Sequence, residues 1–489
     1  MLDWLKELLP ILILLVVVAI VLARLPKIEL GHSAKFMARR RWNWLPLGLT
    51  YAFLYMGRYN LKVSKFAFEN LQGSHGHSMM GNEAFGVIFG VGTVIYGFSF
   101  LVNGPLTDRF GGRFSILMGA AGAAVANLVM GLMSLSLVHL GPGHAFFAQN
   151  FVVLFSLLYG VNMYFQSFGA VAIVKVNSSW FHVRERGVFG AIFGILISLG
   201  IYFAFDWGLF VLEHLGLAWV FFVPALILGI FWLVDFSIVR DHPSQAGFAD
   251  ISLGDATDGV EGPPMSPAKV FGMMLRNPII MTIATIEFCS GWLRQSIMQW
   301  FRTFAKQTDI SLGLSSGFVY NNWGLLLCVA GIMGGVVAGV ISDHVFQSRR
   351  GPVAALLYAF MLVCAVIMIF TYTQPWVGWL VVLMSMAVIG VHGMLSGTAS
   401  MDFGGSKNAG IAVGLIDGFV YLGTAAMSFT YAVILPHETL DELGRLGGAA
   451  TNPANWKSWP ISMVPLAIVG LFLAWRIRHA IPHGKKKAA

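Results

Sequence analysis

Apolar runs long enough to cross a membrane recur along the whole of this 489-residue chain. A helix needs about 20 apolar residues to span the hydrocarbon core of a bilayer. The chain is 57% hydrophobic and 11% charged, whereas about 25% of the residues in a soluble domain are charged. The sequence therefore predicts an all-α, multi-pass membrane protein. The expected spans lie near residues 8–24, 44–66, 84–107, 114–138, 147–176, 188–212, 217–238, 278–304, 316–342, 353–372, 376–400, 409–435 and 459–477.

Lysine and arginine residues gather in alternate loops between these runs. They occur within residues 27–41, 109–113, 184–186, 240–276, 349–350 and 476–487, whereas the 436–458 loop carries three acidic residues. Cytoplasmic loops of membrane proteins are rich in these cations, so the pattern predicts that residues 25–43, the central loop and the C-terminus lie in the cytoplasm. Topology thereby accounts for the net charge of +8, and no nucleic-acid partner is expected.

The first apolar run, Leu8–Leu22, has two interpretations. Its length is also that of the apolar part of a signal peptide. However, Asp3 and Glu7 precede it and no Ala-x-Ala cleavage site follows, which favours an extra N-terminal transmembrane helix that is retained. With the cytoplasmic linker that follows it, this helix makes up residues 1–43. Docking to a membrane partner is one role it could have.

A polar stretch at residues 239–277 divides the remaining chain. It is rich in Gly, Pro, Asp and Ser, which is typical of linkers. The spacing Gly104-x-x-x-Asp108 returns 235 positions later as Gly339-x-x-x-Asp343, which indicates an internal duplication. We predict two six-helix bundles around a central cavity, at residues 44–238 and 278–478, followed by a basic cytoplasmic tail at 479–489.

Two arginines occupy matched positions deep inside apolar runs of the two halves. Arg58 and Arg294 are 236 positions apart, close to the repeat spacing. An arginine at the centre of a membrane helix costs about 2.5–3.5 kcal/mol on insertion scales, so two at matched positions need a compensating partner. An anionic substrate on the pseudo-symmetry axis is one such partner. A helix–helix ion pair is the alternative, and Glu287, seven residues before Arg294, could share its face.

Several motifs narrow the class of membrane protein. GPLTDRFGGR at 104–113 resembles the loop motif of major facilitator transporters. YGFS at 96–99, RDHPSQAG at 240–247, SDHVF at 342–346 and KNAG at 407–410 resemble, in order, motifs of the organophosphate:phosphate antiporters of that superfamily. The resemblance runs from about residue 44 to 478, and the chain is identified as a member of this antiporter family.

The resemblance implies roles for individual residues. Arg58, in Arg-x-Asn-Leu, and Arg294 match the pair with which the family binds phosphate. A planar guanidinium can hold two phosphate oxygens and stays charged at any working pH. The loop motifs imply a cytoplasmic gate. Its residues are Gly104, Asp108, Arg109, Arg113 and Asp343.

Three departures from the family pattern suggest a substrate unlike those of the nearest relatives. Phe100, Cys328 and Ser179 stand where a lysine, a glutamate and a histidine are expected from the resemblance. Lys62 and Lys65 share a helix face with Arg58 and could complete a cationic stripe, or could instead reach the membrane surface. Tyr59, Gln295 and Asn322 are further candidates for the polar lining.

Two acidic residues also lie within apolar runs. Glu287 and Asp417 either pair with a base, such as Lys62 or Arg294 in the empty protein, or carry a proton. Substrate phosphate would displace a paired carboxylate and so couple occupancy to movement of the gate. The sequence leaves both roles open.

These features together predict a secondary transporter that exchanges a phosphorylated metabolite for inorganic phosphate by alternating access. We expect a monomer with no cofactor, no metal and no enzymatic activity, because the sequence carries no nucleophile set, metal cluster or nucleotide loop. Proton-coupled transport of another organic anion is one alternative. A transporter-like membrane sensor of sugar phosphate is the other.

Overall fold

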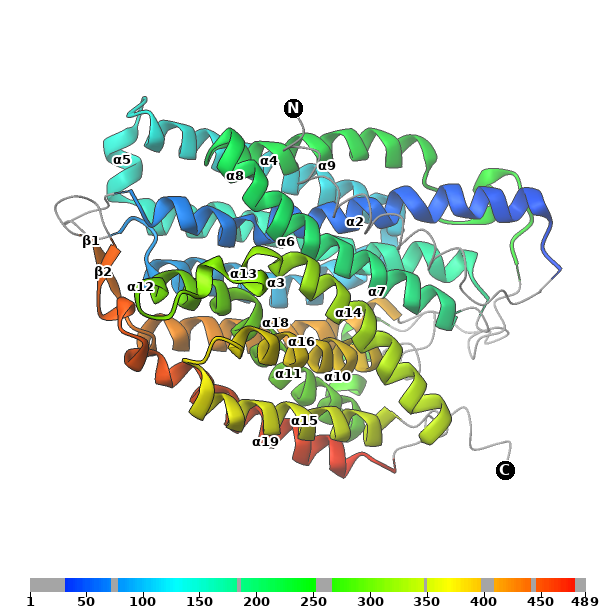
Figure 1. Cartoon of the computed structure of the whole chain (residues 1–489). Helices are drawn as coiled ribbons and strands as arrows, with labels where there is room; N and C mark the ends of the chain where they lie inside the picture. Colours follow the sequence, from blue (N-terminus) through cyan, green and yellow to red (C-terminus); the bar gives the residue numbers. More distant parts are fainter. Residues whose placement is uncertain are drawn as a thin grey trace.

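The computed structural model describes residues 31–71, 78–182, 186–251, 266–346, 350–396, 409–440 and 446–479. The helix expected at 8–24 and the basic tail lie outside this part of the chain. The described residues are overwhelmingly helical, and the helices run roughly parallel along one axis (Figure 1).

The first half of the chain forms one group of helices. Its long members are α2 (Ala34–Phe68), α3 (Asn82–Phe110), α4 (Gly112–Val138), α6 (Phe151–Trp180), α7 (Arg186–Tyr202) and α9 (Trp219–Ile238). The short helix α5 (His144–Gln149) precedes α6, and α7 continues through a π-helical segment, η3 (Phe203–Trp207), into α8 (Gly208–Leu215). A 3₁₀ turn, η4 (Pro243–Ala246), follows α9.

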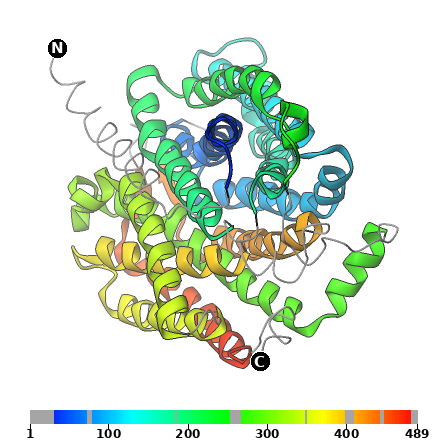
Figure 2. The same ribbon diagram turned by 90° about the vertical axis from the view of Figure 1, so that its right-hand side faces the viewer.

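The second half forms the other group. It contains α11 (Pro278–Gln307), α14 (Trp323–Val340), α15 (Arg350–Thr371), α16 (Val377–Met394), α18 (Ala409–Ile434) and α19 (Ser458–Arg476). Helix α10 (Pro267–Arg276) lies before α11, with short elements elsewhere between the long ones: α12 (Asp309–Leu312), η5 (Leu314–Ser316), α13 (Phe318–Asn321), η6 (Ile341–Val345), η8 (Ala449–Thr451) and η9 (Pro453–Lys457). Figure 2 shows the two groups end-on, with the orange α18 between them.

Different parts of the chain mark the two ends of the helical array. One end, here called the hairpin end, carries the antiparallel strands β1 (Glu438–Leu440) and β2 (Leu446–Gly448), at the left of Figure 1. The opposite end carries the arginine-rich start of α2 and is here called the basic end. The basic end is the one that the distribution of Lys and Arg predicts to be cytoplasmic.

Nine helices in the described part of the chain are long and apolar enough to cross a membrane. Helices α2 and α11 are also long, with 35 and 30 residues. They are not among the nine apolar helices, and each carries at least two buried cations. These two helices hold the matched arginines. Helix α14 is apolar but shorter.

The span expected at 316–342 is broken in the structure. A short turn of helix, α13, ends at Asn321, and a new helix begins at Trp323. Asn322 lies between them with a φ of −114° and a ψ of 32°, outside helical geometry. The apolar pattern alone did not reveal this break, which leaves the first N–H groups of α14 without intrahelical acceptors.

Glycines bring α11 and α18 into backbone contact beside Arg294. A Cβ on Gly291 would lie 1.9 Å from the carbonyl oxygen of Val420, and a Cβ on Gly423 would lie 2.0 Å from that of Phe288. No side chain fits at either distance. Small residues at membrane helix crossings permit this close approach. The crossing places Tyr421 of α18 next to α11.

We therefore expect Gly291→Ala to destabilise the protein. The added methyl group forces α11 from α18, and overpacking of this kind typically costs about 1–3 kcal/mol. The variant should melt at a lower temperature than the wild type in detergent. Gly335→Ala is the matched control, because a Cβ at Gly335 meets nothing within 4 Å. Equal melting temperatures for the two variants would contradict this account of the crossing.

Candidate anion-binding site

Arg58 lies in the middle of α2 and is fully buried. Its guanidinium donates to the hydroxyl oxygens of Tyr421 and Tyr96, both at 2.7 Å, and more weakly to Gln166 Oε1 at 3.4 Å. The rings of Tyr55 and Tyr96 each lie 4.5 Å from the guanidinium carbon. A cage of neutral aromatic side chains thus surrounds this cation.

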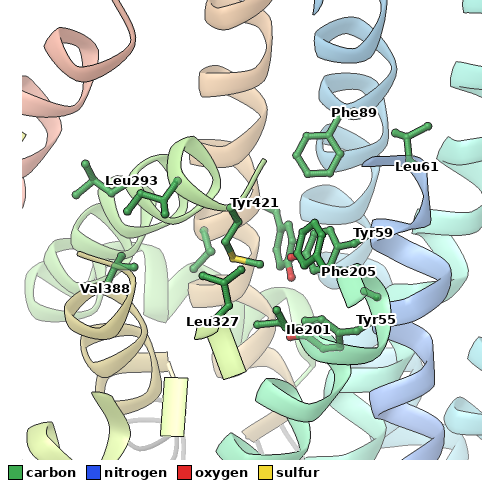
Figure 3. Packing of buried hydrophobic residues seen from close by; sticks show 14 of the residues in the cluster. Tyr55, Tyr59, Leu61, Phe89, Ile201, Phe205, Leu293, Leu327, Val388 and Tyr421 are labelled. Atoms are coloured by element: carbon green, nitrogen blue, oxygen red, sulfur yellow. The ribbon is translucent and has the colours of Figure 1, made fainter. Parts of the chain in front are cut away.

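Arg294 lies opposite, on α11, and is 5% exposed. Its guanidinium carbon is 6.0 Å from the Tyr421 ring centroid, and that of Arg58 is 5.7 Å from the same centroid. Both guanidinium groups therefore lie beside the same tyrosine ring. The adjacent residue Gln295 donates to Tyr59 Oη at 2.9 Å, which joins α11 to α2. Figure 3 shows Tyr55 and Tyr59 on α2 with Tyr421 and Phe205 nearby.

Neither arginine is neutralised by a carboxylate. Among the described residues, no Asp or Glu oxygen lies within 4.0 Å of either guanidinium. Arg58 Nε, Arg294 Nε and Arg294 Nη2 are buried without a hydrogen-bond partner. An unpaired buried charge costs several kcal/mol, and N–H groups left without acceptors add to that cost. The arrangement is suited to an anion with several oxygens, such as phosphate.

The proposed cationic stripe on α2 divides into two environments. Lys62 is buried, donates to Thr303 Oγ1 of α11, and lies over the rings of Phe85 and Trp300 at 4.6 and 5.3 Å. It has no carboxylate partner in the described part of the chain. Lys65, by contrast, pairs with acidic groups at the hairpin end. Of the two lysines, only Lys62 therefore resembles the arginines in lacking an acidic partner.

The buried acids do not neutralise the cations of the site. Glu287 Oε2 lies 2.8 Å from His392 Nδ1 of α16, and Asp417 accepts a hydrogen bond from Ser396. Pairing of these acids with Lys62 or Arg294, one of the two roles that the sequence left open, is absent from the described contacts. The sequence could not identify His392 as the partner, because it lies 105 positions from Glu287. The described residues contain no cluster of three or more His, Cys, Asp or Glu that could hold a metal ion.

Three further residues that the sequence singled out do not contact the two arginines in the same way as the residues above. Asn322 is in the turn before α14, where its side chain donates to Phe318 O at 2.9 Å, so the structure does not bring it to the arginines. Phe100 packs on Tyr96, with ring centroids 4.9 Å apart, and so supports the aromatic cage where the family pattern has a lysine. Cys328 is buried in α14.

The predicted gate residues lie at the basic end. Asp108 accepts a hydrogen bond from Lys175 of α6 at 2.7 Å, which joins α3 to α6. The backbone N–H of Arg113, just after the α3–α4 turn, donates to Asp241 Oδ1 at 2.8 Å. Arg109 is exposed, and Gly104 is buried in α3. The side chain of Asp343 lies outside what the structure describes.

A buried polar network closes the hairpin end between the two groups of helices. Lys65 Nζ lies 3.5 Å from Glu69 Oε2 and 3.3 Å from Glu438 Oε1. Gln307 of α11 donates to Glu69 Oε1 at 2.7 Å, and Asn82 of α3 donates to Gln307 at 2.9 Å. Lys65, Glu69 and Glu438 are at most 5% exposed. Sequence inspection missed this network because its members are far apart along the chain.

The fold and the site together define a multi-pass helical membrane protein with two buried arginines, neither paired with a carboxylate in the described residues, between two groups of helices. A profile of the Major Facilitator Superfamily matches residues 47–428. The chain therefore belongs to the Major Facilitator Superfamily, as its motifs predicted. A solved structure of a bacterial homolog of the human lysosomal transporter Spinster, inward-facing and unoccupied, has the same fold, with a TM-score of 0.62 at 12% identity over 92% of this chain and 98% of that one.

Sequence relatives agree with the resemblance to organophosphate:phosphate antiporters. The glycerol-3-phosphate transporter of Bacillus subtilis (strain 168) is 25% identical, covering 88% of this chain and 91% of the transporter. A probable hexose phosphate transport protein of Chlamydia pneumoniae is 23% identical, covering 77% and 79%. The membrane sensor protein UhpC of Escherichia coli (strain K12) is 22% identical, covering 82% and 88%.

Proposed function

We propose that this protein is a bacterial inner-membrane carrier that exchanges a phosphorylated organic anion for inorganic phosphate by alternating access. The observation that carries the proposal is a pair of buried arginines, Arg58 and Arg294, that have no carboxylate partner in the described residues and that each keep at least one buried guanidinium nitrogen without an acceptor. The names of the glycerol phosphate and hexose phosphate relatives support the same class of substrate. We expect the carrier to act as a monomer with its C-terminus in the cytoplasm.

The geometry suggests how the anion would act on the two groups of helices. Arg58 belongs to the first group, and Arg294 and Tyr421 belong to the second. A phosphate between the arginines would take both guanidinium groups as donors and so bind the two groups together. Charge-assisted, two-pronged contacts of this kind are stronger than the contacts of Arg58 with neutral tyrosine hydroxyls. Substrate would therefore replace the tyrosines as the partner of Arg58.

The empty carrier has a reason to resist changing its conformation. Without an anion, a change of conformation would move two like-charged guanidinium groups relative to each other at the interface between the two groups of helices. No counter-charge would lie between them. Such a barrier favours exchange over net transport, because each transition then needs a bound anion. The closed network around Lys65 at the hairpin end makes this structure a state that is shut on that side.

A thermal-shift screen of the purified protein tests the substrate class. Inorganic phosphate, glycerol phosphate, sugar phosphates, phosphoglycerates and phosphoenolpyruvate would each be added to the protein in neutral detergent. A ligand that binds only the folded state raises its melting temperature by mass action. We expect at least one phosphorylated compound to do so and the unphosphorylated counterparts not to. No shift with any of them would contradict the proposal.

Proton-coupled transport of an organic anion is the second candidate function. The buried contact between Glu287 and His392 favours it, because a histidine–carboxylate pair at membrane depth can bind and release a proton. Glu287 Oε1 is also buried without a partner. Glu287 is seven residues before Arg294 on α11, so a proton there would alter the field at the anion site.

A pH gradient across proteoliposomes separates these two functions. Under the exchange proposal, an imposed gradient leaves anion uptake unchanged in the wild type and in His392→Asn. Under proton coupling, the gradient drives uptake by the wild type, and His392→Asn loses this response. His437→Asn is the matched control, since His437 is exposed and its ion-pair partner among the described residues is the exposed Glu83 at 3.5 Å. Specific binding without any transport would instead indicate a sensor.

A further inference from the structure

A set of backbone N–H donors that holds a carboxylate, here called the receptor, lies where η3 meets α14. The carboxylate of Asp206, in the π-helical segment η3, accepts hydrogen bonds from the backbone N–H groups of Gly324 and Leu325, both at 2.8 Å. These are among the first N–H groups of α14, which have no acceptor within their own helix. Asp206 belongs to the first group of helices and α14 to the second. The acid thus occupies a receptor built by the other half of the chain.

Arg302 of α11 faces the same position. It is 1% exposed, and its Nε donates to Tyr320 O at 2.9 Å. Its Nη1 and Nη2 atoms are buried without a hydrogen-bond partner. Nη2 is 3.8 Å from Asp206 Oδ1, beyond hydrogen-bond distance. Asp206 therefore accepts hydrogen bonds from the backbone part of the receptor but makes only an ion-pair contact, without a hydrogen bond, with the guanidinium fork of Arg302.

The contact of Asp206 with α14 is close, and the neighbouring arginine distinguishes it from a simple helix cap. A Cβ on Gly324 would lie 2.8 Å from Asp206 Oδ1, so the absence of a side chain there allows the carboxylate to approach. Asp309, at the same end of the molecule, is a carboxylate that accepts from a backbone N–H group without an arginine beside it in the described part of the chain. Its Oδ1 accepts from Ser315 N at 2.8 Å, and no arginine lies within ion-pair distance of it among the described residues.

We propose that the N-terminus of α14 and Arg302 form a second anion site, which binds inorganic phosphate or the phosphoryl group of the transported anion when Asp206 leaves it. Helix N-termini bind phosphate through free N–H groups and the helix dipole, and an arginine fork adds two charge-assisted bonds. Asp206 acts as an internal competitor for this site. The site is distinct from the proposed Arg58–Arg294 site.

The position of the site fits a role at the hairpin end. Arg302 is eight residues after Arg294, so it lies about 12 Å farther along α11 toward that end. Phosphate that displaces Asp206 would break a contact between the two groups of helices. Binding at this site would therefore favour opening of the hairpin end. Arriving anions would then reach the Arg58–Arg294 pair next.

Phosphate binding to the purified full-length chain tests the site. In an Arg58→Gln, Arg294→Gln background, which removes the main site, Asp206→Ala should raise the affinity for inorganic phosphate about tenfold or more, because the competitor is gone. Adding Arg302→Gln should abolish the gain, and Asp309→Ala in place of Asp206→Ala should give none. Neutral detergent excludes anionic lipid, and added phosphatidylglycerol that displaces phosphate would identify a headgroup as the ligand. No gain with Asp206→Ala would overturn the proposal.

A second measurement leaves both arginines of the main site intact. Cys328 lies one turn after Gly324 on α14 and is buried. In a Cys289→Ser, Cys364→Ser chain, phosphate should accelerate labelling of Cys328 by an impermeant maleimide added at the hairpin end. Arg302→Gln should remove this acceleration while phosphate still raises the melting temperature through the main site. Acceleration that is unchanged in Arg302→Gln would overturn the second site and leave the proposed function standing.

Discussion

Arg58→Gln and Arg294→Gln are each expected to weaken binding of a phosphorylated ligand by about 30-fold or more. Truncating one partner of a buried, hydrogen-bonded charge pair typically costs about 2–5 kcal/mol, and about 1.4 kcal/mol corresponds to a tenfold change in affinity. Glutamine is polar but shorter and uncharged, so the loss reports the removal of the charged guanidinium fork. Calorimetric titration of the purified variants with the best ligand of the thermal-shift screen measures it.

Two further variants show whether the effect is specific. Arg478→Gln removes a surface arginine that lies over Trp475 and should leave the affinity unchanged. Arg58→Lys keeps the charge but loses the planar fork, and we expect it to recover only part of the affinity. If Arg58→Gln and Arg294→Gln both bind as well as the wild type, phosphate binds elsewhere in the protein.

Lys65→Met is expected to open the hairpin end. The substitution removes the cation between Glu69 and Glu438, which leaves Glu438 buried without it, while Glu69 keeps Lys306 at 3.7 Å. Breaking a buried ion pair by removing one partner typically costs about 3–5 kcal/mol, because the remaining charge is uncompensated. The closed state should therefore lose most of its advantage over the open one. Labelling of a cysteine placed at the buried Met80, in a chain without its native cysteines, measures the opening.

The exposed ion pair at the same end is the control for Lys65→Met. His437 Nδ1 and Glu83 Oε2 are 3.5 Å apart with side chains 50% and 68% exposed. Exposed pairs contribute at most about 1 kcal/mol, so His437→Ala should leave the labelling rate unchanged. If His437→Ala speeds labelling as much as Lys65→Met does, burial of the network is not what holds this end closed.

The sequence predicted the class of fold because membrane helices follow from the length of apolar runs. It also located the central arginines, since their cost in a membrane is visible without any contact. It did not identify their partners. Arg58 contacts Tyr421, which is 363 positions away. That contact depends on how α11 and α18 cross at Gly291 and Gly423, and local patterns carry no information about such crossings.

The predictions that the structure modified share a physical cause. Lys65 was a candidate for the stripe beside Arg58, but it faces Glu438, 373 positions away. Glu287 was a candidate partner for Arg294, and it contacts His392 instead. Helical periodicity places a side chain on a face of its own helix and does not say which neighbour covers that face. Asp206 and Arg302 were missed as a pair for the same reason.

Exchange of labelled inorganic phosphate in proteoliposomes tests the central claim most directly. The account predicts that wild-type vesicles loaded with unlabelled phosphate take up the label, that phosphate-free vesicles do not, and that an Arg58→Gln, Arg294→Gln protein is inactive in both. Equal uptake into phosphate-free vesicles, or exchange by the double variant at the wild-type rate, would contradict the claim that these two arginines bind the transported anion.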